Sequence, residues 1–154
     1  MIKTRIRKFV LEKWPNKGEV IVRTIQRKYK WKNVVVNNLN YILQPQKRIV
    51  VNGFTYSANF GDALNIPLTK LLFRKTVIEA KLLLFSHVEE ILLVGSSIHL
   101  ANSKTIVCGA GCISPLKFPS EVPKKILAVR GPLTAKILRQ NNFECPDIFG
   151  DPAL

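Results

Sequence analysis

The sequence has few of the features that define membrane-spanning or disulfide-stabilised proteins. No apolar run approaches the roughly 18 residues needed to cross a bilayer, and the longest runs, at 82–85 and 91–94, have the length of strands. The basic amino terminus is not followed by an apolar stretch, so we expect no secretory signal and a cytoplasmic location. The three cysteines, Cys108, Cys112 and Cys145, form no C-x-x-C pair. We therefore expect reduced packing residues and no metal site.

Familiar catalytic signatures are also missing. The 154 residues contain no Walker loop, no G-x-S-x-G motif and no Ser/His/Asp series. Of the two histidines, His87 stands in an apolar stretch, which favours a packing role. His99 follows a strand-like run within the first turn of the next element, so we retain it as a candidate functional residue.

Acidic residues are scarce at one end of the chain. The net charge is +14, and residues 1–48 hold 13 Lys or Arg against two acids, which makes this segment +11. Its periodicity predicts two short basic amphipathic helices separated at 15–18, then an irregular Asn-rich stretch up to Pro45. The basic faces fit solvated helices packed on the body, contact with an anionic membrane surface, or nucleic-acid binding. No nucleic-acid motif is present, so we expect no nucleic-acid partner.

The pattern changes to short apolar runs that alternate with helix-like stretches from residue 48 onward. Near-continuous Ile, Val and Leu runs indicate strands buried on both faces, as in a parallel sheet covered by helices. The predicted strands are 48–53, 90–95, 104–109, 125–130 and 147–150, and the predicted helices are 64–73, with Leu64, Leu68, Leu71 and Leu72 on one stripe, and 131–140. We therefore predict an α/β, Rossmann-like domain at 49–154, preceded by a basic helical extension at 1–48.

Three loops are expected at the carboxyl ends of these strands, where open parallel sheets bind ligands. In the first, Gly61 permits a turn, and Asp62 or Asn65 can cap the next helix; a capped turn alone would explain these residues. In the second, Gly109 and Gly111 would let a ligand approach the backbone, although the full G-x-G-x-x-G pattern is missing.

The third loop, at 130–134, has a guanidinium directly before a helix amino terminus. Arg130 and the free N–H groups between Gly131 and Thr134 would suit an anion. A surface salt bridge is the alternative role of Arg130 that spacing alone leaves open.

In this order, the loops resemble the polysaccharide pyruvyltransferase family, in particular the branch related to succinoglycan-pyruvylating enzymes. The matching stretches are NFGDALN at 59–65, ILLVGSSIH at 91–99, IVCGAG at 106–111, AVRGPLT at 128–134 and GDPAL at 150–154. The resemblance covers roughly 49–154 and excludes the basic extension. It implies one lobe of a two-lobed, GT-B-like architecture, with the second lobe absent from this chain and the activity of a truncated product in question.

The resemblance also implies a chemistry, in which a pyruvyl group passes from phosphoenolpyruvate to sugar hydroxyls of a saccharide or lipid-linked oligosaccharide, without a cofactor. On this scheme Arg130 binds the donor with Gly131 and Thr134, while Asp62 and His99 are the acid/base candidates. Asn59, Gly61, Gly109 and Gly111 are the further substrate-binding candidates. Peripheral contact of residues 1–48 with the inner membrane face is expected.

Two other functions fit the same residues. A lobe of a nucleotide-sugar glycosyltransferase would share the sheet and cleft but bind a nucleotide. A non-enzymatic basic module would bind membranes or nucleic acid through residues 1–48, and salt would weaken that binding steeply.

Overall fold

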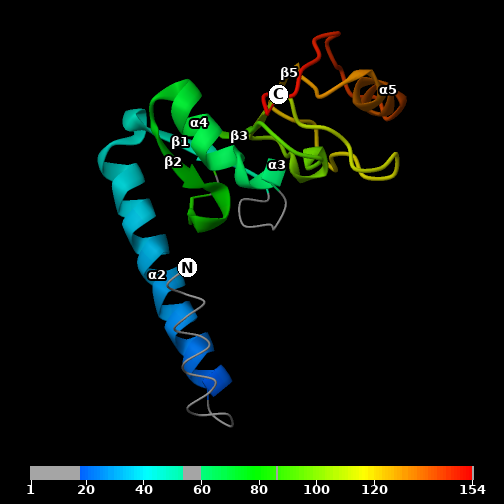
Figure 1. The fold of residues 1–154 in the computed structure, drawn as a ribbon. Coiled ribbons are helices and arrows are strands. Elements are labelled where there is room, and N and C mark those ends of the chain that lie inside the picture. Colours follow the sequence, from blue (N-terminus) through cyan, green and yellow to red (C-terminus); the bar gives the residue numbers. More distant parts are fainter. Residues whose placement is uncertain (1–17, 54–59, 86, 154) are drawn as a thin grey trace.

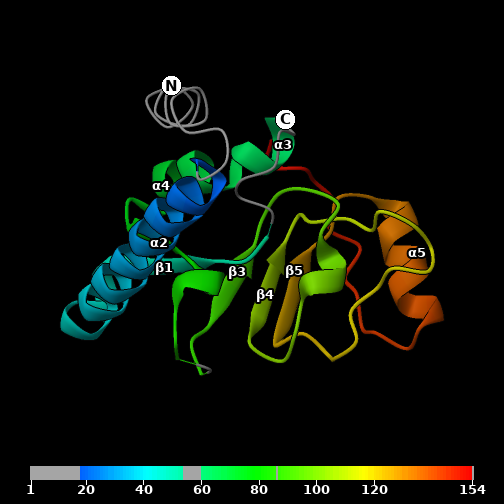
Figure 2. The same cartoon turned by 90° about the horizontal axis from the view of Figure 1, so that it is seen from below.

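The computed structural model describes residues 18–53, 60–85 and 87–153, and for 18–30, Phe60 and Asp62 it describes the backbone alone. The elements in chain order are α2 (Gly18–Leu43), η1 (Pro45–Lys47), β1 (Arg48–Val51), α3 (Phe60–Ala63), α4 (Asn65–Phe73), β2 (Thr76–Glu79), η2 (Ala80–Leu82), β3 (Glu90–Leu92), η3 (Ile98–Leu100), β4 (Thr105–Cys108), β5 (Lys125–Ala128) and α5 (Pro132–Gln140). The helix α2 lies at one end of the sheet and α5 at the other (Figures 1 and 2).

Five parallel strands form one sheet in the order β2-β1-β3-β4-β5. This confirms the predicted α/β, Rossmann-like class. The order reverses between β1 and β3, and such a reversal opens a crevice at the carboxyl ends of the strands in doubly wound sheets. The functional loops should therefore gather at that edge.

The apolar runs of the sequence produce the core, because they supply side chains to both faces of the sheet. Leu92, Val107 and Val129 are fully buried and pack with Leu138 of α5. The predicted strands at 48–53, 90–95, 104–109 and 125–130 are confirmed as β1, β3, β4 and β5. The run at 147–150 makes a single parallel bridge, from Phe149 to Val129, rather than a full strand.

The basic extension differs from the prediction. The helix α2 continues through the Asn-rich stretch to Leu43, where an irregular segment was expected. Buried Asn38 explains the difference, because its side chain donates to the Leu82 carbonyl at 2.8 Å and accepts from the Leu84 N–H at 2.9 Å. Tertiary hydrogen bonds thus offset the low helix propensity of asparagine. The first predicted basic helix lies outside the described residues.

The predicted Leu stripe of α4 is also wrong in part. Leu71 and Leu72 are exposed, while the fully buried side chains of this helix are Asn65 and Thr69. Both buried residues are polar and satisfied, since Thr69 donates to the Asn65 carbonyl and Asn65 bonds to the end of β3. A polar face can therefore pack inward here.

Candidate functional site

The loops that follow β3, β4 and β5 meet at the carboxyl edge of the sheet. The Gly111 N–H donates to the Gly95 carbonyl at 2.9 Å, and the Arg130 N–H donates to the Ala110 carbonyl at 3.2 Å. These bonds continue the sheet pairing beyond the strands. The three loops are consequently held side by side. Two of them, at 109–111 and 130–134, are loops that the sequence pattern placed at this edge, whereas the loop after β3 takes the place expected for the loop that precedes α4.

Arg130 extends from the end of β5 across the loop after β4. Its Nη1 donates to the Ser96 hydroxyl at 2.7 Å and its Nη2 donates to the Cys112 carbonyl at 3.3 Å. The guanidinium lies directly over Gly111, because a Cβ atom there would stand 2.7 Å from Nε and 2.8 Å from Cζ. We call Arg130, Ser96, Gly111 and the Cys112 carbonyl the Arg130 site.

This arrangement can bind an anion. A guanidinium has five N–H groups, and two of them make the bonds to Ser96 and Cys112, so others remain for a ligand. The side chain is exposed, yet two contacts fix its direction. Because the Ser96 hydroxyl accepts from Arg130, its own proton can be donated to the same anion. Among the described side chains, Arg130 makes no salt bridge of the kind left open as an alternative, and its partners there are a hydroxyl and a carbonyl.

The amino terminus of α5 contributes less than predicted. The Thr134 N–H donates to the Gly131 carbonyl at 3.1 Å, and the buried Thr134 hydroxyl accepts from the Cys112 N–H at 3.2 Å. The expectation of a free N–H at Thr134 is therefore wrong, and this residue positions the loop that carries Cys112. Gly131 is open, because a Cβ atom there would meet nothing within 4 Å.

Glycines 109 and 111 have different surroundings. Gly109 has φ +118°, and a Cβ atom there would lie 2.5 Å from Pro152 Cδ and 2.9 Å from the Gly150 carbonyl oxygen. Its backbone is therefore approached by the protein's own segment at 150–152, not left open to a ligand. Gly111 is covered by the Arg130 guanidinium in the same way. Both glycines permit close packing within the fold.

His99 is the acid/base candidate whose side chain the structure describes. His99 lies in η3, immediately after the loop that contains Ser96, and is half-buried. Burial, and then the positive charge of Lys117, lower the pKa of His99 below its ordinary value of 6.5. The imidazole is consequently neutral near pH 7.

The first loop is described only in part. Asp62 and Gly61 belong to α3, where the Gly61 carbonyl accepts from the Leu64 N–H at 3.2 Å. The side chain of Asp62 and all of Asn59 lie outside the described residues. The structure therefore brings Arg130, Gly111 and the His99 element to one edge, and it leaves the side chain of Asp62 without a described position.

The sequence did not predict the structural roles of two residues at this edge. Ser96 was not singled out, because a serine after a strand carries no distinctive signal. Asn65 was expected as a helix cap, but its amide instead pairs with the backbone of Val94, donating to the carbonyl at 3.2 Å and accepting from the N–H at 3.0 Å. This pairing ties α4 to the end of β3, next to Gly95 and Ser96.

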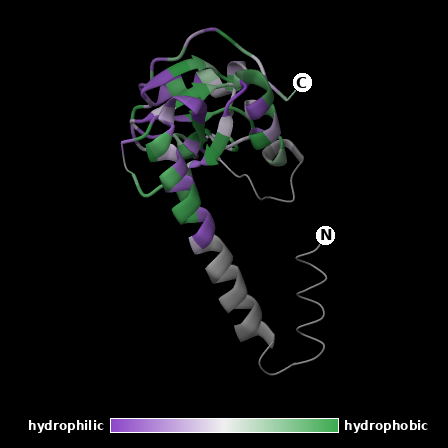
Figure 3. Cartoon of the chain, turned by 90° about the vertical axis from the view of Figure 1, so that its left-hand side faces the viewer, coloured by the Kyte–Doolittle hydropathy of each residue, from purple (hydrophilic) through white to green (hydrophobic). Residues whose placement is uncertain are grey.

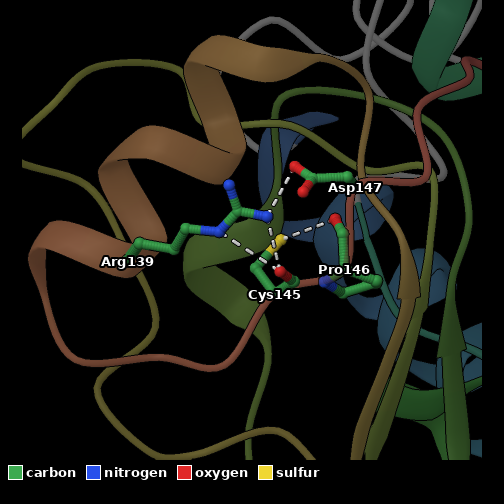
Figure 4. A network of polar contacts seen from close by, with 4 residues as sticks. All are labelled: Arg139, Cys145, Pro146 and Asp147. Atoms are coloured by element: carbon green, nitrogen blue, oxygen red, sulfur yellow. Dashed lines mark hydrogen bonds and ion pairs between the residues drawn. The ribbon is translucent and has the colours of Figure 1, made fainter.

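A second arginine has a structural role. Arg139 of α5 donates through Nε and Nη2 to the Cys145 carbonyl, at 3.2 and 2.7 Å, and through Nη2 to Asp147 at 2.6 Å (Figure 4). These bonds hold the returning chain against α5, so that Phe149 reaches Val129. The hydrogen bonds of Arg139 thus stabilise the fold, whereas Arg130 keeps N–H groups for a ligand.

The cysteines and the other titratable groups do not form a metal centre in the described part of the chain. There, no group of three or more His, Cys, Asp or Glu side chains has the arrangement needed to hold a metal ion. The three cysteines are free thiols, and burial is the main cause that raises the pKa of each. Buried thiols with raised pKa values are weak nucleophiles.

Comparisons with known proteins add nothing to the geometry. No protein-family model, curated protein or solved structure matches this chain. Across the described residues, no helix has both the length and the apolar character required to traverse a bilayer.

Proposed function

We propose that residues 49–154 form the amino-terminal lobe of a polysaccharide pyruvyltransferase with a GT-B-like architecture, and that this lobe contributes Arg130 to the donor site. The observation that carries the proposal is the position of Arg130 at the carboxyl edge of the sheet, fixed by Ser96 and Cys112 with further N–H groups exposed. Phosphoenolpyruvate has a carboxylate and a phosphate, and a forked guanidinium binds such groups with two parallel hydrogen bonds. The resemblance of the loop sequences supplies the reaction.

In that reaction, the methylene carbon of phosphoenolpyruvate is protonated and a sugar hydroxyl attacks the neighbouring carbon. Phosphate then leaves, and a second hydroxyl closes the cyclic ketal. One hydroxyl proton balances the new methyl group and the other departs with phosphate. Arg130 would hold the donor while negative charge accumulates on the leaving phosphate, with the Ser96 hydroxyl and the Gly131 N–H as additional donors.

His99 and Asp62 remain the acid/base candidates. A histidine with a lowered pKa is neutral near pH 7, which suits acceptance of a proton from a sugar hydroxyl better than donation to carbon. Asp62 is assigned to the acceptor on the resemblance alone. The acceptor is a saccharide or lipid-linked oligosaccharide, and the enzyme would work at the cytoplasmic face of the membrane, with peripheral contact through the basic extension.

A ligand comparison tests the donor assignment. The chain is titrated with phosphoenolpyruvate, inorganic phosphate and a nucleotide-sugar, and the shift in Tm is measured for each. We expect phosphoenolpyruvate to raise Tm more than phosphate does, and the nucleotide-sugar to have no effect. Arg130→Ala should weaken the apparent phosphoenolpyruvate affinity about tenfold to a hundredfold, because it removes a charge-assisted pair.

Lys70→Ala is the matched control, since it removes one exposed positive charge from α4 and leaves the Arg130 site intact. It should retain the donor shift. A larger shift with the nucleotide-sugar would replace the proposal with a glycosyltransferase lobe. Equal donor affinity in wild type and Arg130→Ala would remove Arg130 from the donor site.

A further inference from the structure

One side of α2 is attached to the body. Val34 and Asn38 are buried, and Asn38 bonds to the Leu82 carbonyl and the Leu84 N–H. One turn further, the ring of Tyr41 lies 6.3 Å from the ring of Phe85. These contacts fix the rotation of α2 about its axis, and so they determine which residues face outward.

A second side of α2 is apolar and exposed. Trp31, Val35, Leu39 and Ile42 have the spacing i, i+4, i+8 and i+11, which places them on one stripe of a helix. The exposed apolar residues of these turns, which we call the α2 apolar face, are Trp31, Val35, Val36, Leu39, Ile42 and Leu43. In Figure 3 the coloured turns of α2 alternate between hydrophobic and hydrophilic residues, as expected for a helix with sides of different polarity. Six exposed apolar side chains on these turns, with exposed Lys32 among them, are typical of an interaction surface.

The charge around this face limits the kinds of partner. Exposed Lys32 follows Trp31 directly, and Lys47 lies just beyond the end of the helix. Residues 1–48 together have a net charge of +11. Two copies joined along α2 would bring these like charges together, which opposes self-association. Nucleic acid would satisfy the charge but offers no apolar surface for six hydrophobic side chains.

An anionic bilayer satisfies both features. Amphipathic helices of this kind lie parallel to the surface, with the apolar side among the upper acyl chains and basic residues near the headgroups. A tryptophan at such a boundary is favoured, because its ring is apolar and its N–H is polar.

We infer that α2 docks the protein on an anionic membrane by inserting the α2 apolar face, with the neighbouring lysines on the lipid phosphates. This rests on the peripheral membrane contact proposed above and assigns it to one helix face. The α2 apolar face, not the basic charge alone, holds the protein on the bilayer.

Vesicle binding tests the inference. The chain is mixed with vesicles of phosphatidylcholine and phosphatidylglycerol at 3:1, and with phosphatidylcholine alone, and bound protein is measured by flotation. In a Trp14→Phe background Trp31 is the remaining tryptophan, so its emission reports this face. We expect binding and a blue shift with the anionic vesicles. The double variant Leu39→Ser, Ile42→Ser should reduce partitioning about tenfold or more, because two exposed apolar side chains no longer enter the bilayer.

The control is Leu71→Ser, Leu72→Ser, which makes the same change on exposed residues of α4 and should bind as wild type does. Circular dichroism checks that both double variants fold. The inference would be overturned in favour of charge alone if the protein bound anionic vesicles without a blue shift of Trp31 emission and if the α2 and α4 double variants bound equally well. A dimer that the α2 variant abolishes, with no vesicle binding, would overturn it in favour of self-association.

The same variants separate this inference from the donor proposal. Arg130→Ala should float with anionic vesicles as wild type does, and the α2 double variant should keep the phosphoenolpyruvate-induced shift in Tm. Loss of both properties in either variant would show that neither site acts as assigned.

Discussion

The Arg130 site depends on a residue that has no side chain. The guanidinium of Arg130 occupies the volume where a Cβ atom of residue 111 would stand, at 2.7 Å from Nε. Any larger residue at 111 must displace the end of a flexible side chain, which costs little folding free energy. The direction of the guanidinium, and with it the anion site, is therefore more sensitive to this position than the stability of the fold is.

Gly111→Ala should consequently separate binding from stability. We expect the apparent affinity for phosphoenolpyruvate to fall about tenfold, because the bonds of Arg130 to Ser96 and Cys112 are lost when the guanidinium moves. The Tm of the ligand-free protein should change by only a few degrees. Calorimetric titration and thermal unfolding on the same preparation measure both quantities.

Gly131→Ala provides the comparison for this variant. A Cβ atom at 131 meets nothing within 4 Å, and the residue has an extended backbone that alanine adopts. Residue 131 lies next to Arg130 in sequence. We expect the Gly131→Ala variant to bind the donor as the wild type does. If both glycine variants lost the donor equally, the contact between Gly111 and the guanidinium would not explain the loss.

At the scale of elements, the sequence predicted the sheet well where burial is continuous. The strands β1, β3 and β4 contain Ile, Val and Leu with buried side chains, and burial leaves such runs with one favourable arrangement. The edge strand β5 was also predicted, because its apolar run continues into buried Val129, although its own residues are exposed or partly exposed. The strand β2 was missed, because its sequence, TVIE, has only two apolar residues and these stand between a threonine and a glutamate. So short an apolar run carries little of this signal.

The apolar periodicity of the sequence did not fully predict the helices or the site. The apolar stripe of α4 was misassigned and α2 was ended too early, because Asn65 and Asn38 are buried through bonds to residues distant in sequence. Arg130 and Gly111 could be predicted from their loops. Ser96 could not, since it becomes recognisable only where folding brings the loop after β3 beside Arg130. Pairings across the sheet edge are not encoded in local spacing.

The docking of α2 depends on one amide. Replacing Asn38 with alanine leaves the Leu82 carbonyl and the Leu84 N–H without these partners, which costs about 1–3 kcal/mol. We expect the Leu84 amide to exchange with solvent about tenfold faster or more in Asn38→Ala, measured by hydrogen exchange. Exposed Asn33, on the same helix, is the control, and Asn33→Ala should leave that rate unchanged. Equal rates in the two variants would mean that other contacts hold α2.

Over the whole molecule, most of the net positive charge lies in the segment that also carries the α2 apolar face. Residues 1–48 carry a net +11 and the remaining residues +3 of the total +14. The Arg130 site and the α2 apolar face belong to opposite parts of this distribution, with α2 at one end of the sheet and α5, next to Arg130, at the other (Figure 1). A membrane-bound orientation through α2 can therefore leave the carboxyl edge of the sheet open to a donor from solution.

Salt separates the two forces that would hold such a complex. The range of electrostatic attraction falls from about 10 Å at 0.1 M salt to about 3 Å at 1 M, whereas apolar burial does not weaken with salt. We expect binding to anionic vesicles to decrease between these concentrations and then to level off above zero. In Leu39→Ser, Ile42→Ser, where two of the six apolar side chains are replaced, we expect the binding that remains at 1 M salt to be about tenfold weaker than that of the wild type, or weaker still. Complete release of the wild-type protein at 1 M salt would mean that the basic residues act without the apolar face, since a side chain inserted among acyl chains stays there when the headgroup charge is screened.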